Sequence, residues 1–146
     1  MRDLSLEEYR ALAEFRYQIR RFLHFSEERV REQGLEPQQH QLLLAIRGLP
    51  DGATATVGEL AARLQLKHHS AVELVDRLEK HGYVTRGRSG EDRRQVILHL
   101  TASASRVLRK LSVAHHEELE TAGPVLSKAL RAIAAQHQIR RRRQVA

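Results

Sequence analysis

The densest group of charged side chains lies in the stretch RGRSGEDRRQ, at residues 86–95. Four arginines and two acids surround a Ser-Gly pair, and the apolar segment VILHL follows directly. A guanidinium presents a planar fork of N–H donors that matches phosphate and carboxylate oxygens. The stretch therefore predicts a surface for an anionic partner. A merely solvated, charged loop is the competing interpretation.

A second group of polar side chains recurs in HHSAVELVDRLEKHG, at residues 68–82. Helical spacing turns one face inward, formed by Ala71, Leu74, Val75 and Leu78. Side chains on the opposite face can donate to and accept from base edges in a DNA major groove. With the preceding lysine, the candidates for DNA contact are Lys67, His68, His69, Ser70, Glu73 and Arg77. The alternative for each is a solvated helix face, and Glu73 could equally orient Arg77.

Catalysis and metal binding lack comparable support in the sequence. No Gly-rich phosphate loop, HExxH motif or Ser-centred elbow is present, so we expect no enzyme and no cofactor. Nine histidines are present. Those that are adjacent point about 100° apart on a helix and cannot chelate one ion as an i, i+4 pair does. We expect no metal site. A metal-responsive regulator stays open as an alternative through convergence of His24, His40, His115 and His116.

Composition narrows the class of partner. The formal net charge is +7 in 146 residues, which favours nucleic acid or an anionic membrane surface. Acidic residues among the basic ones in the amphipathic segments disfavour the membrane. Cysteine is absent, which excludes disulfides and Cys-ligated zinc. No apolar run approaches the roughly 20 residues of a membrane span, and no signal-peptide core is present, so we expect a cytoplasmic protein.

The elements that hold these two groups read as a winged helix-turn-helix over residues 37–101. Pro37 opens a helix that ends at Gly48, and residues 53–57 could pair briefly as a strand. Thr56 and Glu59 form a capping box for a short helix before the polar helix. YVTRGR and QVILHL flank the arginine-rich loop, the second segment alternates like a strand, and Ser89-Gly90 offers the turn between them. A helix-turn-helix followed by a β-hairpin is the winged-helix arrangement.

Amphipathic helices flank this part on both sides. Residues 5–34 predict one long helix, with a Ser5/Glu8 capping box and a stop at Gly34. Residues 102–138 predict two helices separated by a break at Gly123-Pro124. The arginine-rich end, residues 139–146, reads as a frayed or disordered basic tail.

The segments LVDRLEKHGYV and DRRQVILHLT resemble the MarR (multiple antibiotic resistance regulator) family of bacterial winged-helix transcription factors. The resemblance implies a single MarR-like domain over residues 1–146, mainly α with a small β-hairpin wing and N- and C-terminal dimerisation helices. It implies a homodimer that binds a pseudo-palindromic operator on double-stranded DNA, most often as a repressor. It also implies that Arg94 enters the minor groove and that Asp92 orients it. Arg88 and Arg93 are then expected on phosphates.

Lys67 departs from the Ser or Thr with which many relatives cap the recognition helix. Ala104 replaces a glycine that often follows the Leu-Thr pair. Lys67 and the His68-His69 pair make the base-reading surface unusual, so the operator sequence is not transferable from better-known members. A non-specific, architectural DNA-coating protein is the main rival, although its recognition helix would be uniformly basic.

The long apolar stripes of the flanking helices exceed what one small domain covers, so we expect them to pair across a two-fold axis. The candidate dimer-interface residues are Tyr9, Leu12, Ile19, Leu111, Leu126, Leu130 and Ile133. The resemblance also implies a small aromatic or phenolic effector, held between the dimerisation helices and the winged part. Phe15, Phe22 and His40 are candidates for that cleft, and a core role for the aromatic residues is the competing interpretation.

Overall fold

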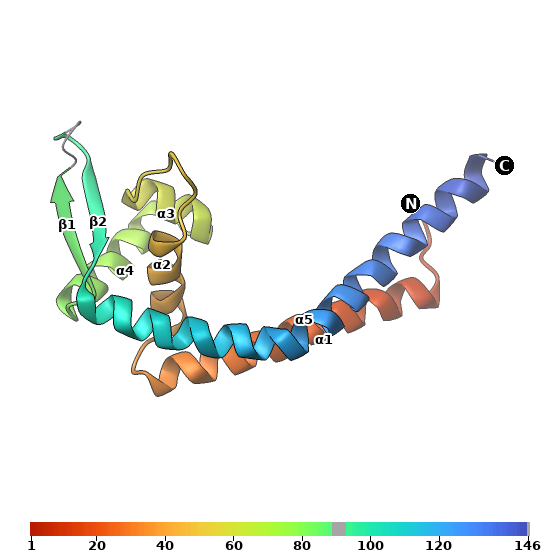
Figure 1. The fold of residues 1–146 in the computed structure, drawn as a ribbon. Helices are drawn as coiled ribbons and strands as arrows, with labels where there is room; N and C mark the ends of the chain where they lie inside the picture. Colours follow the sequence, from red (N-terminus) through yellow and green to blue (C-terminus); the bar gives the residue numbers. More distant parts are fainter. Residues whose placement is uncertain (89–92, 146) are drawn as a thin grey trace. The chain divides into compact units, whose positions relative to one another are not determined.

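The computed structural model describes residues 1–88 and 93–145 of the chain (Figure 1). Its elements, in chain order, are α1 (Leu6–Glu32), α2 (Pro37–Arg47), α3 (Val57–Leu64), α4 (His68–Lys80), β1 (Val84–Arg88), β2 (Val96–Leu100) and α5 (Ala102–Val145). The predicted fold class, mainly α with one β-hairpin, is confirmed. The chain divides into two compact units. We call residues 29–112 the winged unit, and residues 1–28 with 113–146 the helical unit.

Local side-chain chemistry starts the helices of the winged unit. The Thr56 hydroxyl accepts the backbone N–H of Glu59 at 3.2 Å, so α3 begins at the predicted capping box. At α2, Glu36 and Gln39 form a second capping box ahead of Pro37, which the sequence analysis did not single out. Helix α4 follows Lys67 without a side-chain cap, as the missing Ser or Thr implied.

The core of the winged unit joins all of its elements. The inward face of α4 is buried in this core, as its spacing predicted. Each leucine side chain that is buried in this way contributes about 1.5–3 kcal/mol to the stability of the fold. Figure 1 shows helices α2 to α4 gathered beside the hairpin. The core cluster consists of Val30, Leu35, Leu42, Leu43, Leu60, Leu74, Val75, Leu78, Val84, Leu98, Ala104, Leu108 and Leu111.

The hairpin is anchored at its base by a threonine. Strands β1 and β2 pair antiparallel, with Val84 opposite Leu100 and Arg88 opposite Val96. The Thr101 hydroxyl donates to the Gly82 carbonyl at 2.7 Å, and it accepts the backbone N–H of Ala104 at 3.2 Å. Thr101 therefore caps α5 and fixes the base of the wing at the same time.

The predicted short strand at residues 53–57 is wrong as an element. One backbone hydrogen bond, from Leu98 N–H to the Ala55 carbonyl at 2.9 Å, connects that segment to β2. The segment does not form a strand, because Thr56 is the N-cap of α3 and the chain enters that helix at Val57. The predicted turn at Ser89-Gly90 lies outside the described residues.

The predicted break at Gly123-Pro124 is also wrong, because α5 continues through Pro124 as one helix of 44 residues. Proline lacks the N–H that would donate four residues back, and its ring crowds that carbonyl, at a cost of about 3 kcal/mol. Helical hydrogen bonds on both sides of Pro124 offset this cost. An internal proline therefore often kinks a helix rather than ending it.

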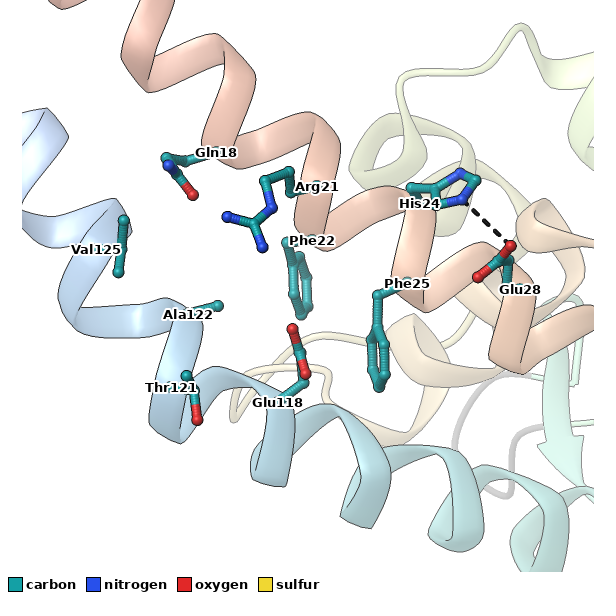
Figure 2. A pocket seen from close by; sticks show the side chains of 10 residues that line it. All are labelled: Gln18, Arg21, Phe22, His24, Phe25, Glu28, Glu118, Thr121, Ala122 and Val125. Carbon is teal, nitrogen blue, oxygen red and sulfur yellow. Dashed lines mark ion pairs between the residues drawn. The ribbon is translucent and has the colours of Figure 1, made fainter.

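The helical unit pairs the first 28 residues of the chain with α5 from Val113 onward. The rings of Phe22 and Phe25 lie edge-on to His115, with centroids 6.1 and 6.2 Å away. Beside them is a cavity of about 260 Å³ between the two helices. Figure 2 shows Arg21, Phe22 and Phe25 reaching into it from α1, opposite Glu118 of α5.

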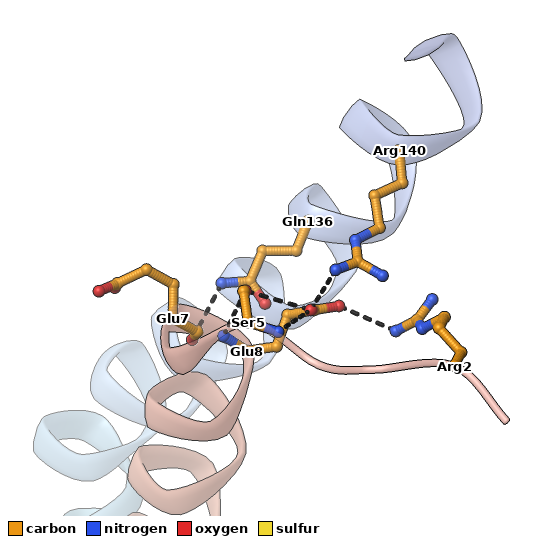
Figure 3. Close-up of polar contacts among 6 residues, drawn as sticks. All are labelled: Arg2, Ser5, Glu7, Glu8, Gln136 and Arg140. Atoms are coloured by element: carbon orange, nitrogen blue, oxygen red, sulfur yellow. Dashed lines mark hydrogen bonds and ion pairs between the residues drawn. The ribbon is translucent and has the colours of Figure 1, made fainter. Parts of the chain in front are cut away.

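The end of α5 is helical and contacts the start of the chain, which corrects the prediction of a frayed or disordered tail. Figure 3 shows the Glu8 carboxylate between the guanidinium groups of Arg2 and Arg140. The same carboxylate accepts the backbone N–H of Ser5 at 2.9 Å, so the Ser5/Glu8 capping box is confirmed. Gln136 donates to the Glu7 carbonyl at 3.2 Å. Tertiary contacts thus extend the helix into a segment whose composition favours disorder.

Candidate nucleic-acid interface

The outward face of α4 presents most of the predicted base-reading side chains to solvent. The exposed candidates on this helix and just before it are Lys67, His68, His69, Glu73 and Arg77, whereas Ser70 is half-buried. Because the opposite face of α4 is fixed in the core, these side chains stand on a rigid support. A helix with a buried apolar face and an exposed polar face can lie in a major groove.

The hairpin carries the second set of predicted contacts. Arg88, Arg93 and Arg94 are exposed, as a loop that reaches phosphates or a minor groove requires. The Arg88 guanidinium donates to the Arg93 carbonyl at 3.2 Å, so part of its donor set braces the hairpin. Asp92, the predicted orienting acid of Arg94, lies outside the described residues.

Arg86 has a role that the sequence analysis did not identify. Its guanidinium, on β1, contacts Asp76 at 2.6 Å and Glu79 at 2.9 Å on α4. The Asp76 hydrogen bond, opposed by partial burial and aided by the Glu79 charge, raises the pKa of Arg86 above its usual range. Two outward acids three residues apart, followed by an arginine in the adjoining strand, are the sequence signal for this link.

The candidate dimer residues fall into two groups. Tyr9, Leu12 and Leu130 are exposed in the helical unit, at 58%, 43% and 53% of their full surface. The half-buried members are Ile19, Leu126 and Ile133. The prediction that Leu111 lies in the dimer interface is corrected, because Leu111 is 2% exposed and packs in the core of the winged unit. Helical periodicity put it on the apolar stripe but could not tell which part of that stripe its own chain covers.

The candidate effector residues are divided between the two units. Phe22 lines the cavity of the helical unit shown in Figure 2, and Phe15 is half-buried on the same helix outside its lining. His40 is 5% exposed on α2, in the winged unit. His40 therefore belongs to the interior of a unit rather than to an open site.

The histidines of the metal-responsive alternative are similarly dispersed. His24 pairs with Glu28 at 3.2 Å, and His115 is buried beside the two phenylalanines. Across residues 1–88 and 93–145, no three His, Asp or Glu side chains are grouped closely enough to hold a metal ion. Over the same residues, no helix combines the length and apolar character needed to cross a membrane.

Helices α3 and α4 and the arginine-bearing hairpin, packed on one core, form a winged helix-turn-helix. Residues 33–95 match the family model of the MarR family. The HTH-type transcriptional regulator YfiV of Bacillus subtilis is 35% identical over 91 residues, which are 62% of this chain and 54% of YfiV. The chain thus matches about half the length of this relative.

Solved structures share the fold over most of the chain. AbsC, a MarR family transcriptional regulator from Streptomyces coelicolor, superposes with a TM-score of 0.71 at 21% identity, over 94% of this chain and 99% of AbsC. The MepR–DNA complex of S. aureus gives a TM-score of 0.60 at 18% identity, over 84% of this chain and 93% of MepR. The match to the MarR family model thus covers most of the winged helix-turn-helix part of the chain. These relatives and neighbours are named as transcriptional regulators, in agreement with the expectation of a protein that is not an enzyme.

Proposed function

We propose that this chain is a homodimeric, sequence-specific repressor that binds a pseudo-palindromic operator. The observation that carries the proposal is the pairing of two DNA-reading surfaces in one unit. Helix α4 turns His69, Glu73 and Arg77 outward from a buried face, and the adjoining hairpin exposes Arg93 and Arg94. The net charge of +7 supplies a general attraction to DNA.

The two surfaces have different tasks in this proposal. Side chains of α4 meet base edges in the major groove, where each base pair presents a distinct donor and acceptor pattern. Arg94 enters the minor groove, where a narrow groove concentrates negative potential. Arg88 and Arg93 contact phosphates, which place the protein without reading sequence.

Dimerisation through the helical unit gives the two-fold symmetry that a palindrome requires. Exposed apolar side chains gather in this unit at Leu6, Tyr9, Leu12, Leu23, Val125, Leu130 and Ile139. Such a concentration favours burial against a second copy. Two recognition helices related by this symmetry would read half-sites about one helical turn, ~34 Å, apart.

Selection of bound duplexes from a random pool, followed by sequencing, tests the central claim. We expect an enriched pseudo-palindrome and an affinity for it at least ~10³-fold above that for random duplex. Equal affinity for the selected and random duplexes would instead support the architectural alternative. The mixed His, Ser, Glu and Arg surface of α4 disfavours that alternative, because uniform attraction needs uniformly basic side chains.

Repression and relief by an effector are tested separately. A reporter placed behind the selected operator should lose expression when the protein is present. A planar aromatic acid is the class of effector that suits the cavity in Figure 2, since Phe22 and Phe25 offer ring faces and Arg21 a cation. Restored reporter expression with a panel of such acids, and its loss in Phe22→Ala, would support this assignment.

A further inference from the structure

Arg86 differs from the other wing arginines because its guanidinium faces the recognition helix. Nη2 lies 2.6 Å from Asp76 Oδ1, and Nη1 lies 2.9 Å from Glu79 Oε1. One side chain of strand β1 therefore contacts two carboxylates that are almost one turn apart on α4.

An ordinary surface ion pair contributes little to a protein. This contact differs because a single guanidinium uses both terminal nitrogens, which fixes its direction as well as its distance. The Arg86 side chain is 28% exposed, whereas those of Asp76 and Glu79 are 59% and 43% exposed. The arginine is thus enclosed between the two elements, and the acids hold it from the solvent side.

The negative charges of Asp76 and Glu79 also favour a role in holding Arg86. Asp76 and Glu79 are exposed acids on a helix that is proposed to lie against phosphates, where a negative charge weakens binding. Their place on α4 is understandable if they act on Arg86 rather than on DNA. The ion pairs then offset their repulsion and connect the helix to the hairpin.

We propose that Arg86 is a positioning residue: through Asp76 and Glu79 it holds the wing at a set position relative to the recognition helix. The exposed wing arginines and the outward face of α4 can then enter neighbouring grooves of one duplex together. Without the link, each element still attracts phosphates, so discrimination is lost while general attraction remains. This inference rests on the proposed function, since it concerns how the same interface distinguishes an operator.

Removing the two acids provides a test, because a pure charge effect predicts a higher operator affinity and a positioning effect predicts a lower one. The variant Asp76→Asn/Glu79→Gln loses two negative charges per protomer, so simple electrostatics predicts tighter binding to any DNA. We expect unchanged or tighter binding to random duplex but operator affinity lower by about threefold to tenfold. The matched control, Glu32→Gln/Asp51→Ser, removes two exposed acids elsewhere in the winged unit. It should strengthen both affinities alike.

Arg86→Met removes the guanidinium and keeps an unbranched side chain. It should lower operator affinity by a similar factor and leave the slope of log affinity against log salt unchanged. Combined with the acid-to-amide changes it should cause no further loss, because all three residues form one link. Arg86→Lys should be intermediate, since an ammonium is a point charge and cannot bridge both acids equally.

Several results would overturn the inference. If Asp76→Asn/Glu79→Gln tightens operator and random binding by the same factor, the acids act only through their charge. If adding Arg86→Met to that variant weakens binding again and lowers the salt slope by about one unit per lost contact, Arg86 touches phosphate directly.

Amide hydrogen exchange of β1 and β2 in the free protein tests the link between Arg86 and the two acids without any operator. Exchange should accelerate in Arg86→Met and in Asp76→Asn/Glu79→Gln alike, with melting temperatures close to wild type. Unchanged protection in both variants contradicts the link even if the protein recognises an operator. A wild-type protein without operator preference contradicts the proposed function instead, while the exchange result still decides the link.

Discussion

Single arginines in the hairpin have distinct surroundings although the sequence presents them as one cluster. Arg94 is exposed and Arg88 partly braces the hairpin backbone, whereas Arg86 is engaged by α4. The number of arginines in the hairpin therefore overstates the positive charge that is available to DNA. The assignment of Arg94 to the minor groove is open to a direct test.

Arg94→Ala should weaken operator binding substantially because it removes one cation from each half of the dimer. The slope of log affinity against log salt should fall by up to about two units, roughly one per lost contact. Base preferences selected in the major groove should stay nearly constant, since the wing reads little base pattern there. Fluorescence anisotropy titrations across a salt series measure these quantities. Arg47→Ala, another exposed arginine of the winged unit, is the control and should change the slope much less.

Arg77→Ala should behave in the opposite way. Preference at particular positions about 5 base pairs from the dyad should relax, because half-site centres lie about one helical turn apart. Repeating the selection with each variant compares the two arginines. Loss of all preference in Arg94→Ala, together with intact preference in Arg77→Ala, would reverse the division of labour between wing and helix.

His115 makes the stability of the helical unit sensitive to pH. Burial beside Phe22 and Phe25 lowers the pKa of His115 below 6.5, against a smaller opposing effect of a backbone hydrogen bond at Ser26. Between the folded and unfolded pKa values the unfolded chain binds more protons. The stabilisation is therefore complete above about pH 6.5 and declines as pH falls toward the folded pKa.

The corresponding measurement is the free energy of unfolding between pH 7.5 and pH 5.5. Wild type should lose stability over this interval, and His115→Leu should lose less of it. His116→Leu, at the exposed neighbouring position, should follow wild type. Identical pH profiles for all three proteins would show that His115 ionises as freely in the folded state as in the unfolded chain.

At the scale of elements, α5 illustrates how tertiary contacts override local signals. Gly123-Pro124 and the arginine run both predict an end to helical structure, yet the helix extends to Val145. The Glu8 carboxylate accepts the Ser5 N–H and pairs with Arg140 and Arg2, which together lower the pKa of Glu8. The last turns of α5 thus contact the first turn of α1 within the helical unit.

Two truncations that differ by one residue test this contact. Ending the chain after Arg140 should leave the melting temperature near that of the full chain, whereas ending it after Ile139 should lower it slightly. The difference should vanish as pH falls through the depressed pKa of Glu8, because a protonated carboxyl no longer pairs with Arg140. Thermal melts in a pH series from 7 downward provide the comparison. Equal melting temperatures at pH 7 would show that the pair contributes nothing.

At the scale of the whole molecule, the exposed apolar side chains of the helical unit predict assembly. Light scattering at micromolar concentration should report about twice the chain mass of 16.7 kDa. Leu12→Glu/Leu130→Glu should shift the protein toward monomer, because each protomer would place two charges in an apolar interface. Leu44→Glu is the control, since Leu44 is 46% exposed but lies in the winged unit. A monomeric wild type would remove the geometric basis for reading a palindrome.

The sequence by itself determined the elements whose signals are local. Periodicity placed the buried face of α4, and the Ser5 and Thr56 capping boxes marked the starts of α1 and α3. These predictions succeed because side-chain spacing and cap hydrogen bonds act within a few residues of the backbone that they control.

Tertiary structure decided what depends on partners far along the chain. Leu111 and Leu130 lie on similar apolar stripes, but one is in the winged-unit core and the other is exposed. The contact of Arg86 with Asp76 and Glu79, and that of Arg140 with Glu8, likewise join segments that local spacing does not relate. Burial and ion pairing are properties of the folded surroundings. Periodicity alone could therefore place Leu111 and Leu130 on apolar stripes, but it could not assign their roles or find these ion pairs.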